Sequence, residues 1–320
     1  MDREILIVGG AGYVGSAIVD ALCYHNFNIT VLDNLIYEDR YLNPRATFIF
    51  GDVRDPEIYK GLDKYSAIIW LAGIVGDGAC AIDPAQTRAI NVDSVKSLVS
   101  NYKGKIIFPS TCSVYGMSNE LLDESSATNP LSLYAETKLE AEKYIVANHN
   151  NYVIFRLGTL FGLGDTYSRI RLDLVANVLA CRAARKEQLT VYGGQQWRPL
   201  LHVKDVGSAV LYALNTDKVP VGVYNLSMKN YNISELATKI VEVCPGSKIE
   251  LVDIKFEDAR NYRVSSEKIK DTGWKPKHSL EDGIKEIVNT ITENRIKNVN
   301  NSIYSNVAYL KELNKNAQRI

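Results

Sequence analysis

Tyr134 and Lys138 lie four residues apart in a segment of helical pattern, and together they could move a proton. Residues four apart are neighbours on one face of a helix, so the phenol and the ammonium would lie side by side. A nearby cation, helped by a positive nicotinamide ring, should lower the pKa of the tyrosine from its usual value of about 10. Tyr134 could then take a proton from a substrate hydroxyl while hydride leaves the same carbon. Because this spacing also occurs on ordinary helices, the assignment depends on the surrounding segments.

A run of hydroxyl side chains follows an apolar segment upstream of this helix. Residues 105–108 have the pattern of a buried strand, and they lead into Ser110, Thr111 and Ser113. The strands of an open parallel sheet end at the cofactor crevice. The hydroxyls would therefore reach the same site as Tyr134, and we expect Thr111 to hold the reacting oxygen.

The first strand-like segment, residues 4–8, runs directly into a glycine-rich turn and an amphipathic helix. Gly9, Gly12 and Gly15 have a spacing that lets backbone N–H groups at the start of a helix approach a pyrophosphate. Gly10, Gly12 and Gly15 also fit the dinucleotide-binding pattern, in its shorter spacing. A glycine motif by itself is weak evidence for a dinucleotide site.

Asp33 strengthens that assignment because it ends the second strand-like segment, residues 28–32. An acid at this position can bind both hydroxyls of an adenosine ribose, whereas a 2′-phosphate would meet its carboxylate. The expected cofactor is therefore NAD rather than NADP. The alternative is a glycine-rich turn beside a helix-capping acid, with no nucleotide role.

The order of the segments predicts a Rossmann-type α/β fold, a doubly wound parallel sheet with a smaller C-terminal α/β lobe. We expect residues 1–160 to form the NAD-binding domain, with part of 190–230 returning to it, residues 161–295 to form the substrate lobe, and 296–320 to form a tail that docks as a short helix or frays. The predicted strands are 4–8, 28–32, 47–50, 66–72, 105–110, 152–157, 189–192, 223–226 and 248–253, and the predicted helices are 12–25, 84–101, 134–149, 170–186, 204–215 and 232–243.

Composition and charge exclude several classes of protein. The 320 residues are 46% hydrophobic with a formal net charge of +0, so nothing electrostatic favours nucleic acid or an anionic membrane as partner. No charged and apolar leader precedes the first strand, and no apolar run approaches a membrane span, so we expect a cytoplasmic protein. The five cysteines are scattered, which suits reduced thiols. The four histidines lack ligand spacing, so we expect no metal.

These segments resemble the extended short-chain dehydrogenase/reductases that act on nucleotide sugars, over roughly residues 1–290. The motifs that carry the resemblance are Gly9-x-x-Gly12-x-x-Gly15, Asp33, Gly51-Asp52-Val53, Leu71-Ala72-Gly73, Asn91, Thr111 with Val114-Tyr115-Gly116, and Tyr134-x-x-x-Lys138. The resemblance implies that Thr111, Tyr134 and Lys138 are catalytic and that Lys138 also binds the nicotinamide ribose. It implies a cofactor site made of Gly9, Gly12, Tyr13, Val14, Gly15, Asp33, Asn34, Asp52, Val53, Leu71, Ala72, Gly73, Tyr134 and Lys138.

The same resemblance extends to a segment of the C-terminal half, residues 191–206, and Val191 at its start is expected to bind substrate. In the family an arginine of this segment grips the substrate diphosphate, and Arg198 is expected to do so here. A guanidinium presents a planar fork of donors suited to phosphate oxygens, although a surface salt bridge is the alternative role. Asn177 and Arg260 are further candidates for the substrate phosphates. His202 is expected to satisfy a buried hydrogen bond rather than to catalyse.

Departures from the family pattern narrow the expected reaction. Sugar 4,6-dehydratases carry acidic residues between the catalytic threonine and Val-Tyr-Gly, where this chain has Cys112 and Ser113. Enzymes that epimerise at C3 or C5 often place a cysteine at the position of Ser113, whereas Cys112 would point to the other face and is expected to be a packed thiol. The expected reaction is therefore oxidation of a hydroxyl of a nucleoside-diphosphate sugar, with C4 as the expected position. The enzyme would be either a 4-epimerase or a dehydrogenase or reductase.

Further expectations concern the loop after the fourth strand, the alternatives and the assembly. Asp77 could bind a sugar hydroxyl, or it could be only a turn residue between Gly76 and Gly78. An NADP-linked ketoreductase of a small substrate, or a non-catalytic NAD-sensing protein on the same fold, would be alternative functions. A homodimer is expected through the helices 84–101 and 134–149, using apolar residues such as Val95, Leu98, Leu139 and Ile145.

Overall fold

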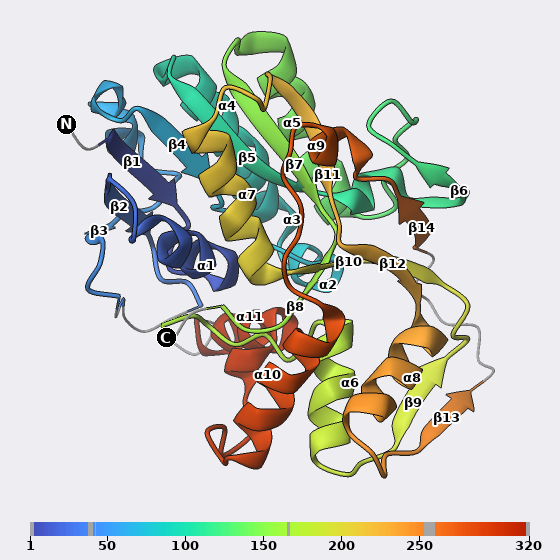
Figure 1. Ribbon diagram of the computed structural model, residues 1–320. Helices are drawn as coiled ribbons and strands as arrows, with labels where there is room; N and C mark the ends of the chain where they lie inside the picture. The colour runs from blue at the N-terminus through green and yellow to red at the C-terminus, as the bar shows by residue number, and fades with distance from the viewer. Residues whose placement is uncertain (1–2, 38–40, 42, 165–166, 253–259, 318–320) are drawn as a thin grey trace.

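A seven-stranded parallel sheet forms the centre of the protein, as a computed structural model describes it for residues 3–37, 41, 43–164, 167–252 and 260–317 (Figure 1). The strand order β11-β7-β5-β4-β1-β2-β3 reverses between β1 and β4. Such a reversal opens a crevice at the carboxyl ends of the strands. The predicted doubly wound parallel sheet is confirmed. Its strands are β1 (Arg3–Val8), β2 (Phe27–Asp33), β3 (Thr47–Phe50), β4 (Ala67–Trp70), β5 (Lys105–Thr111), β7 (Tyr152–Leu157) and β11 (Gly222–Leu226).

Alternation of apolar side chains along the strands lets helices cover both faces of the sheet. In β1, Ile5 and Ile7 pack with α1 (Tyr13–Leu22) and α7 (Val203–Asn215). Leu6 and Val8 point the other way, toward α4 (Ser94–Asn101) and α5 (Leu133–Asn148). All four are nearly or fully buried, as expected for a parallel sheet with helices on both sides. The predicted helix 84–101 is a continuous helical region of α3 (Pro84–Arg88), a π-helical turn (Ala89–Asp93) and α4.

A smaller lobe lies below the carboxyl edge of this sheet in Figure 1. Its core is formed by α6 (Val175–Ala184), α8 (Ile233–Val243) and α10 (Leu280–Thr292), with the parallel pair β9 (Leu189–Tyr192) and β13 (Ile249–Val252). The chain returns to the main sheet between these elements, since β11 pairs with β7 and α7 packs on α1. The other described elements are β6 (Met117–Leu122), β8 (Thr159–Phe161), β10 (Trp197–His202), β12 (Lys229–Asn232), β14 (Asn261–Val264), α2 (Asp77–Cys80), α9 (Glu267–Asp271), α11 (Asn306–Ala317) and short 3-10 turns.

Several predicted bounds differ from the structure. The helix predicted at 170–186 begins only at Val175, because Leu174 is extended, with φ −88° and ψ 135°. Arg171 and Asp173, predicted on that helix, therefore precede it. The prediction also omitted α10 and five short strands. Position 253 of the predicted strand 248–253 lies outside the described residues.

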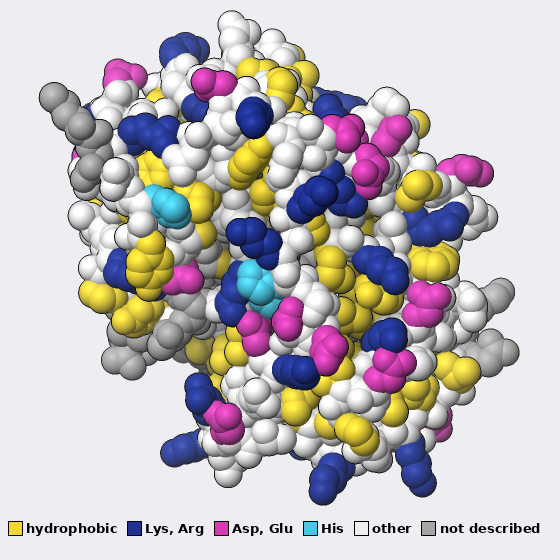
Figure 2. Space-filling view, in the orientation of Figure 1, with side chains coloured by type: hydrophobic (Ala, Val, Ile, Leu, Met, Phe, Trp, Pro, Cys, Tyr) yellow, Lys and Arg dark blue, Asp and Glu magenta, His cyan; other side chains and the backbone are white. Residues whose placement is uncertain are grey.

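The surface and the cysteines agree with the composition. Figure 2 shows basic and acidic side chains interspersed over the face in view. All five cysteines are free, and Cys80, Cys112 and Cys181 are buried. Among the helices of the described residues, none is long and apolar enough to cross a membrane. The described part of the chain also contains no cluster of three or more His, Cys, Asp or Glu residues that could hold a metal ion.

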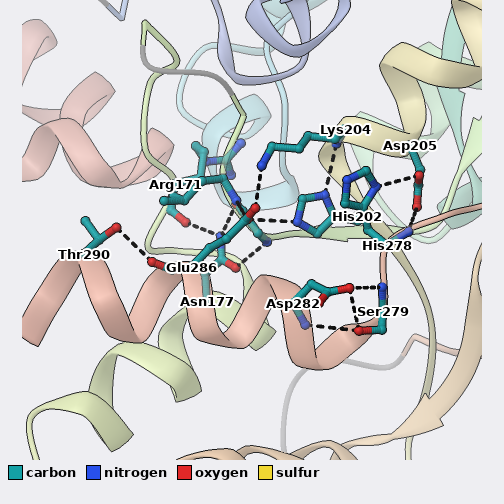
Figure 3. Close-up of polar contacts among 12 residues, drawn as sticks. Arg171, Asn177, His202, Lys204, Asp205, His278, Ser279, Asp282, Glu286 and Thr290 are labelled. Atoms are coloured by element: carbon teal, nitrogen blue, oxygen red, sulfur yellow. Dashed lines mark hydrogen bonds and ion pairs between the residues drawn. The ribbon is translucent and has the colours of Figure 1, made fainter. Parts of the chain in front are cut away.

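A polar network joins the lower lobe to the sheet domain (Figure 3). Glu286 on α10 contacts His202 at the end of β10, with 2.9 Å between Oε2 and Nε2, and it accepts a hydrogen bond from the Leu163 N–H at 2.7 Å. Lys204 on α7 also donates to Glu286, and His278 stacks on His202 with 4.6 Å between ring centroids. His202 is fully buried, and its predicted role in a buried hydrogen bond is confirmed.

This network predicts a specific loss of stability in acid. Burial opposes ionisation of Glu286, but its hydrogen bonds with His202, Leu163 and Lys204 outweigh that cost and lower the pKa of its carboxyl from 4.5 to about 2. The unfolded chain therefore binds the proton first as the pH falls below 4.5, so the stabilisation is present above that pH and is lost toward pH 2. Between pH 6 and 3.5 the wild-type free energy of unfolding should fall by about 1 kcal/mol more than that of Glu286→Gln.

Urea unfolding at a series of pH values would measure this difference. Glu281→Gln on the same helix is the matched control, because Glu281 is exposed and pairs only with Lys285 on its own helix among the ion pairs described. The control should follow the wild-type pH dependence. A wild-type curve parallel to that of Glu286→Gln would contradict the assignment.

Candidate active site

A cleft at the carboxyl edge of the main sheet brings the predicted cofactor and catalytic residues together. Its wall contains the glycine-rich turn after β1, the loops after β2, β3 and β4, the end of β5 and the first turns of α5. Those segments follow neighbouring strands of the sheet, so the reversal of strand order between β1 and β4 creates the cleft.

The glycine turn is shaped so that only glycine fits at two positions. Gly9 has φ +81°, and a Cβ there would come within 2.5 Å of the Ala72 backbone nitrogen. A Cβ on Gly15 would lie 2.5 Å from the Gly10 Cα. Gly12, which caps α1, would place a Cβ no closer than 3.6 Å to the protein, and it lines the cleft. The Gly9-x-x-Gly12-x-x-Gly15 spacing therefore makes a compact turn with its open side at the start of a helix, where a pyrophosphate fits.

Asp33 lies at the tip of β2 beside this turn. Its carboxylate accepts hydrogen bonds from the Ala11 N–H at 3.0 Å and the Leu35 N–H at 2.8 Å. Burial raises the pKa of Asp33, and those N–H groups partly offset the rise. Asn34, the next residue, donates to Asp52 at 2.9 Å. Because Asp33 lines the cleft, its remaining acceptor sites face the space expected for an adenosine ribose.

The loops after β3 and β4 complete this half of the cleft. Val53, Leu71, Ala72 and Gly73 line it, together with Tyr13 and Val14 of α1. Asp52 is not among the lining residues; it forms an ion pair with Arg54 at 2.7 Å, which holds the pKa of its carboxyl far below the usual range. Asn91 fixes the β4 loop by accepting from the Ile74 N–H at 2.7 Å and donating to the Ile74 carbonyl at 3.0 Å.

Thr111, Tyr134 and Lys138 lie together in the opposite wall. Thr111 ends β5, and its hydroxyl lies close enough to the Tyr134 phenol to lower the pKa of that group. Tyr134 and Lys138 come from the first turns of α5, which Ser132 caps by accepting from the Ala135 N–H. The Lys138 ammonium lies 4.0 Å from the centroid of the Phe108 ring. All three residues line the cleft, at the edge of the sheet where the glycine turn lies.

Burial has the largest effect on the acidity of Tyr134 in the protein alone. Burial raises the pKa of the phenol, and the hydrogen bond with Thr111 offsets this only in part. Lys138 does not reverse the shift; burial lowers its own pKa to about 8. Among the protein groups, desolvation of the phenolate dominates, and the lowering of the tyrosine pKa by Lys138 together with a bound nicotinamide stays a prediction.

Residues 112 and 113 distinguish the two faces of the segment after Thr111. Cys112 is fully buried and its thiol contacts the Arg156 carbonyl at 3.2 Å, which confirms a packed thiol. Burial also raises the pKa of that thiol. Ser113 lines the cleft, 3.2 Å from the Tyr262 hydroxyl on β14. The C-terminal lobe thus reaches the catalytic wall through Tyr262, which sequence reasoning did not assign.

The predicted substrate-binding residues are only partly brought to the cleft. Arg260 lines it and forms an ion pair with Asp77 at 3.3 Å. Asp77 also accepts from the Ser132 hydroxyl at 2.7 Å, so it connects the cap of the catalytic helix to the lobe rather than only forming a turn. Arg198 lies behind Arg260, donating at 2.6 Å to its carbonyl oxygen.

Asn177 and Val191 are also absent from the residues that line the cleft. The Asn177 side chain accepts from the Gly162 N–H at 2.9 Å and donates to the Arg171 carbonyl at 2.8 Å. Val191 packs in the core of the lower lobe. Asn177 thus supports the backbone beside Arg171, whose own side chain does line the cleft and pairs with Asp173.

Other lining residues were missed by sequence reasoning. Arg169 and Asn306 come from segments without a recognisable motif, and Tyr37 follows Asp33 by four positions. An arginine outside any motif gives no chemical signal by itself, whereas the hydrophobic anchors of the tail did suggest docking. The cleft is therefore built from both halves of the chain and from the tail.

Comparisons with known proteins agree with this geometry. The family model described as "NAD dependent epimerase/dehydratase family" matches residues 5–227. A UDP-glucose 4-epimerase of Halalkalibacterium halodurans is 30% identical over 313 residues, covering 87% of this chain and 92% of that protein. A dTDP-D-glucose 4,6-dehydratase of Bos taurus is 26% identical, covering 91% and 89%. The structure of a UDP-glucuronic acid 4-epimerase from Bacillus cereus superposes with a TM-score of 0.80 at 23% identity, covering 91% and 99%.

Proposed function

The chain belongs to the NAD-dependent epimerase/dehydratase family, and we propose that it oxidises the C4 hydroxyl of a nucleoside-diphosphate sugar to a keto-sugar. It then acts either as a 4-epimerase, which returns hydride to the other face, or as a 4-dehydrogenase, which releases the ketone. The expectations of this family, of an enzyme and of NAD as cofactor are confirmed.

The observation that carries the proposal is the placement of Thr111, Tyr134 and Lys138 in one wall of the dinucleotide cleft. NAD supplies a hydride acceptor and, in its oxidised form, a positive charge on the nicotinamide ring. Thr111 would hold the reacting hydroxyl, and Tyr134 would accept its proton. Lys138, with a pKa of about 8, is mainly cationic at pH 7 and would bind the nicotinamide ribose.

Dehydration is not part of the proposal, although the family includes dehydratases. Elimination of water needs an acid and a base beside the sugar in addition to the hydride-transfer residues. The positions between Thr111 and Val114 hold a buried thiol, Cys112, and a hydroxyl, Ser113, neither of which is a carboxylic acid. The C4 position is supported by the 4-epimerase names of the relatives.

We propose that Arg260 and Arg171 bind the substrate diphosphate. Both guanidinium groups line the cleft on the side of the lower lobe. Arg260 pairs with Asp77 and Arg171 pairs with Asp173, and a phosphate could compete with these carboxylates for the guanidinium groups. Arg198 would act through Arg260, by holding its backbone.

A panel of UDP-, GDP- and dTDP-sugars given to the NAD-loaded enzyme tests the proposal. An epimerase should interconvert two alcohols with no net change in 340 nm absorbance, whereas a dehydrogenase should accumulate reduced cofactor. Product configuration is read by NMR. The proposal is wrong if no sugar in the panel changes configuration and none reduces the cofactor.

A homodimer through α4 and α5 stays a prediction, but the apolar residues expected in its interface are not on the surface of the chain. Val95, Leu98, Leu139 and Ile145 are buried within the single chain, where they pack on the sheet or its flanks. The outer sides of these helices carry ion pairs such as Lys96–Glu140 instead. A dimer through these helices would therefore use other side chains, and light scattering would give the mass in solution.

A further inference from the structure

The C-terminal segment, residues 302–313, docks on the carboxyl edge of the main sheet. It consists of a 3-10 turn (Ser302–Tyr304) and most of α11, and in Figure 1 it lies between the sheet domain and α10. Leu310 is 6% exposed and packs in the core cluster that contains Val8, Leu32 and Val53. Val307 and Leu313 pack against the same cluster. These positions recur every three residues, so one face of the helix is seated on the domain that holds the cofactor.

Polar contacts fasten the start of α11 to two loops of the cleft. Asn306 is 3% exposed, and its Nδ2 donates to the Val75 carbonyl after β4 at 2.9 Å. Its Oδ1 accepts from the Arg169 guanidinium at 2.5 Å. Arg169 also donates to the Ile303 carbonyl, at 2.7 Å from Nη2, and its guanidinium carbon lies 4.5 Å from the centroid of the Tyr37 ring. Tyr37 in turn lies 6.0 Å from the Tyr309 ring, centroid to centroid.

These residues belong to the wall of the dinucleotide cleft. Asn306, Arg169, Tyr37 and Val75 line it together with Asp33 and the glycine turn. Tyr37 and Val75 lie on the loops after β2 and β4, and both loops contribute to the wall of the cleft. The segment therefore connects the two loops on the side where Asp33 is placed to bind a ribose.

We propose that the C-terminal segment is part of the cofactor site: Asn306, held by Arg169 and Val75, covers bound NAD, and undocking of the segment limits NAD release. The side chain of Asn306 is buried, and both its amide oxygen and its amide nitrogen are hydrogen-bonded. Undocking of the segment must therefore break those bonds and expose Leu310 and the apolar surface on which it packs. The inference rests on NAD as cofactor and not on the proposed sugar chemistry. A negative sugar panel would leave it intact.

The test measures NAD dissociation from the full-length protein. NAD-loaded enzyme is mixed with an excess of alcohol dehydrogenase and ethanol, which trap released NAD as NADH. Asn306→Ala should release NAD about tenfold faster than wild type, the factor expected for the loss of one buried hydrogen-bonding group. Lys311→Ala is the matched control, because Lys311 is exposed on the same helix, and its release rate should equal that of wild type.

Hydrogen exchange on the wild-type protein gives a second readout that needs no substitution. Saturating NAD should slow exchange of the amides of residues 306–313, because an enclosed ligand stabilises the docked segment. Release from Asn306→Ala at the wild-type rate would overturn the proposal. Unchanged exchange in the segment on NAD binding would overturn it as well, even if Asn306→Ala fails to fold.

Discussion

Tyr134→Phe is expected to slow the oxidation step by about 10²–10⁴-fold while NAD and substrate still bind. The substitution removes one hydroxyl, which lies near Thr111, and leaves the ring in its place. The proton of the reacting hydroxyl then has no side chain to accept it while hydride leaves the carbon that carries this hydroxyl. Single-turnover reduction of the bound cofactor, followed at 340 nm with a substrate from the sugar panel, measures the step directly.

Burial determines how this tyrosine can work. It raises the pKa of Tyr134, so the protein alone keeps the phenol protonated at neutral pH. A base at this position needs positive charge close by, and Lys138 retains most of its charge at pH 7 because its pKa is about 8. Charge at Lys138 is lost as the pH rises through 8, which adds a second titration to the rate profile of the wild type.

Tyr262→Phe is the matched control for the loss of a cleft hydroxyl. Tyr262 lines the same cleft and is more deeply buried than Tyr134, and its hydroxyl contacts Ser113. This variant should change kcat by less than about tenfold, since no proton transfer is assigned to it. Equal losses in the two variants would show that Tyr134 contributes only a hydrogen bond. Wild-type turnover in Tyr134→Phe would refute the mechanism.

The main sheet could be predicted from sequence because its strands are buried on both faces. Runs such as 4–8 and 105–108 are continuously apolar, and each is followed by the glycine, acid or hydroxyl residues that line the cleft. The position of a residue at the carboxyl end of such a strand is determined by topology alone. Gly12, Asp33, Thr111 and Tyr134 therefore lie where the sequence placed them.

The lobe was less predictable because its strands are short and half exposed. β12 has the sequence KNYN and β14 the sequence NYRV, so neither contains an apolar run that would indicate a strand. By contrast, α10 had a readable signal: Ser279 and Asp282 form a capping box at the start of a segment whose apolar residues Leu280, Ile284 and Ile287 recur at helical spacing. The sequence contained that helix, and the prediction omitted it.

Arginine roles were the least predictable part of the site. A long guanidinium side chain can reach in several directions, so the motif containing Arg198 does not determine which group it contacts. In the structure it holds the backbone of Arg260, while Arg169 and Arg171 enter the cleft from a segment outside any motif. The tail contributes Asn306 through a tertiary contact more than two hundred residues away in sequence, with Val75.

The second large effect concerns stability rather than chemistry: Glu142→Gln should lower the free energy of unfolding by about 3–5 kcal/mol. Glu142 lies one turn after Lys138 on α5 and is 2% exposed. Its carboxylate contacts the Arg156 guanidinium of β7 at 2.8 Å and 3.1 Å, and it accepts a hydrogen bond from the Ser110 hydroxyl. Arg156 also donates to the Tyr115 hydroxyl at 2.9 Å.

The expected loss is large because the remaining charge would stay buried. Arg156 is 7% exposed and cannot lose its proton, so an uncharged partner leaves a cation in the core with one hydrogen-bonding neighbour fewer. Glu140→Gln is the matched control, two residues away on the same helix, because Glu140 pairs with Arg88 and Lys96 at the surface. That change should cost about 0–1 kcal/mol.

Replacing both members of the buried pair separates the cost of the lone charge from the worth of the pair. Glu142→Leu combined with Arg156→Met removes both charges and keeps apolar volume, so it should be more stable than Glu142→Gln alone by several kcal/mol. Urea unfolding followed by circular dichroism gives all four free energies. If Glu142→Gln is no more destabilising than Glu140→Gln, water must reach Arg156 and the expected cost of a buried lone charge is wrong. The Glu142–Arg156 pair would then contribute little to the packing of α5 on the sheet, and its remaining effect on the site would be the Glu142 charge, which raises the pKa of Lys138.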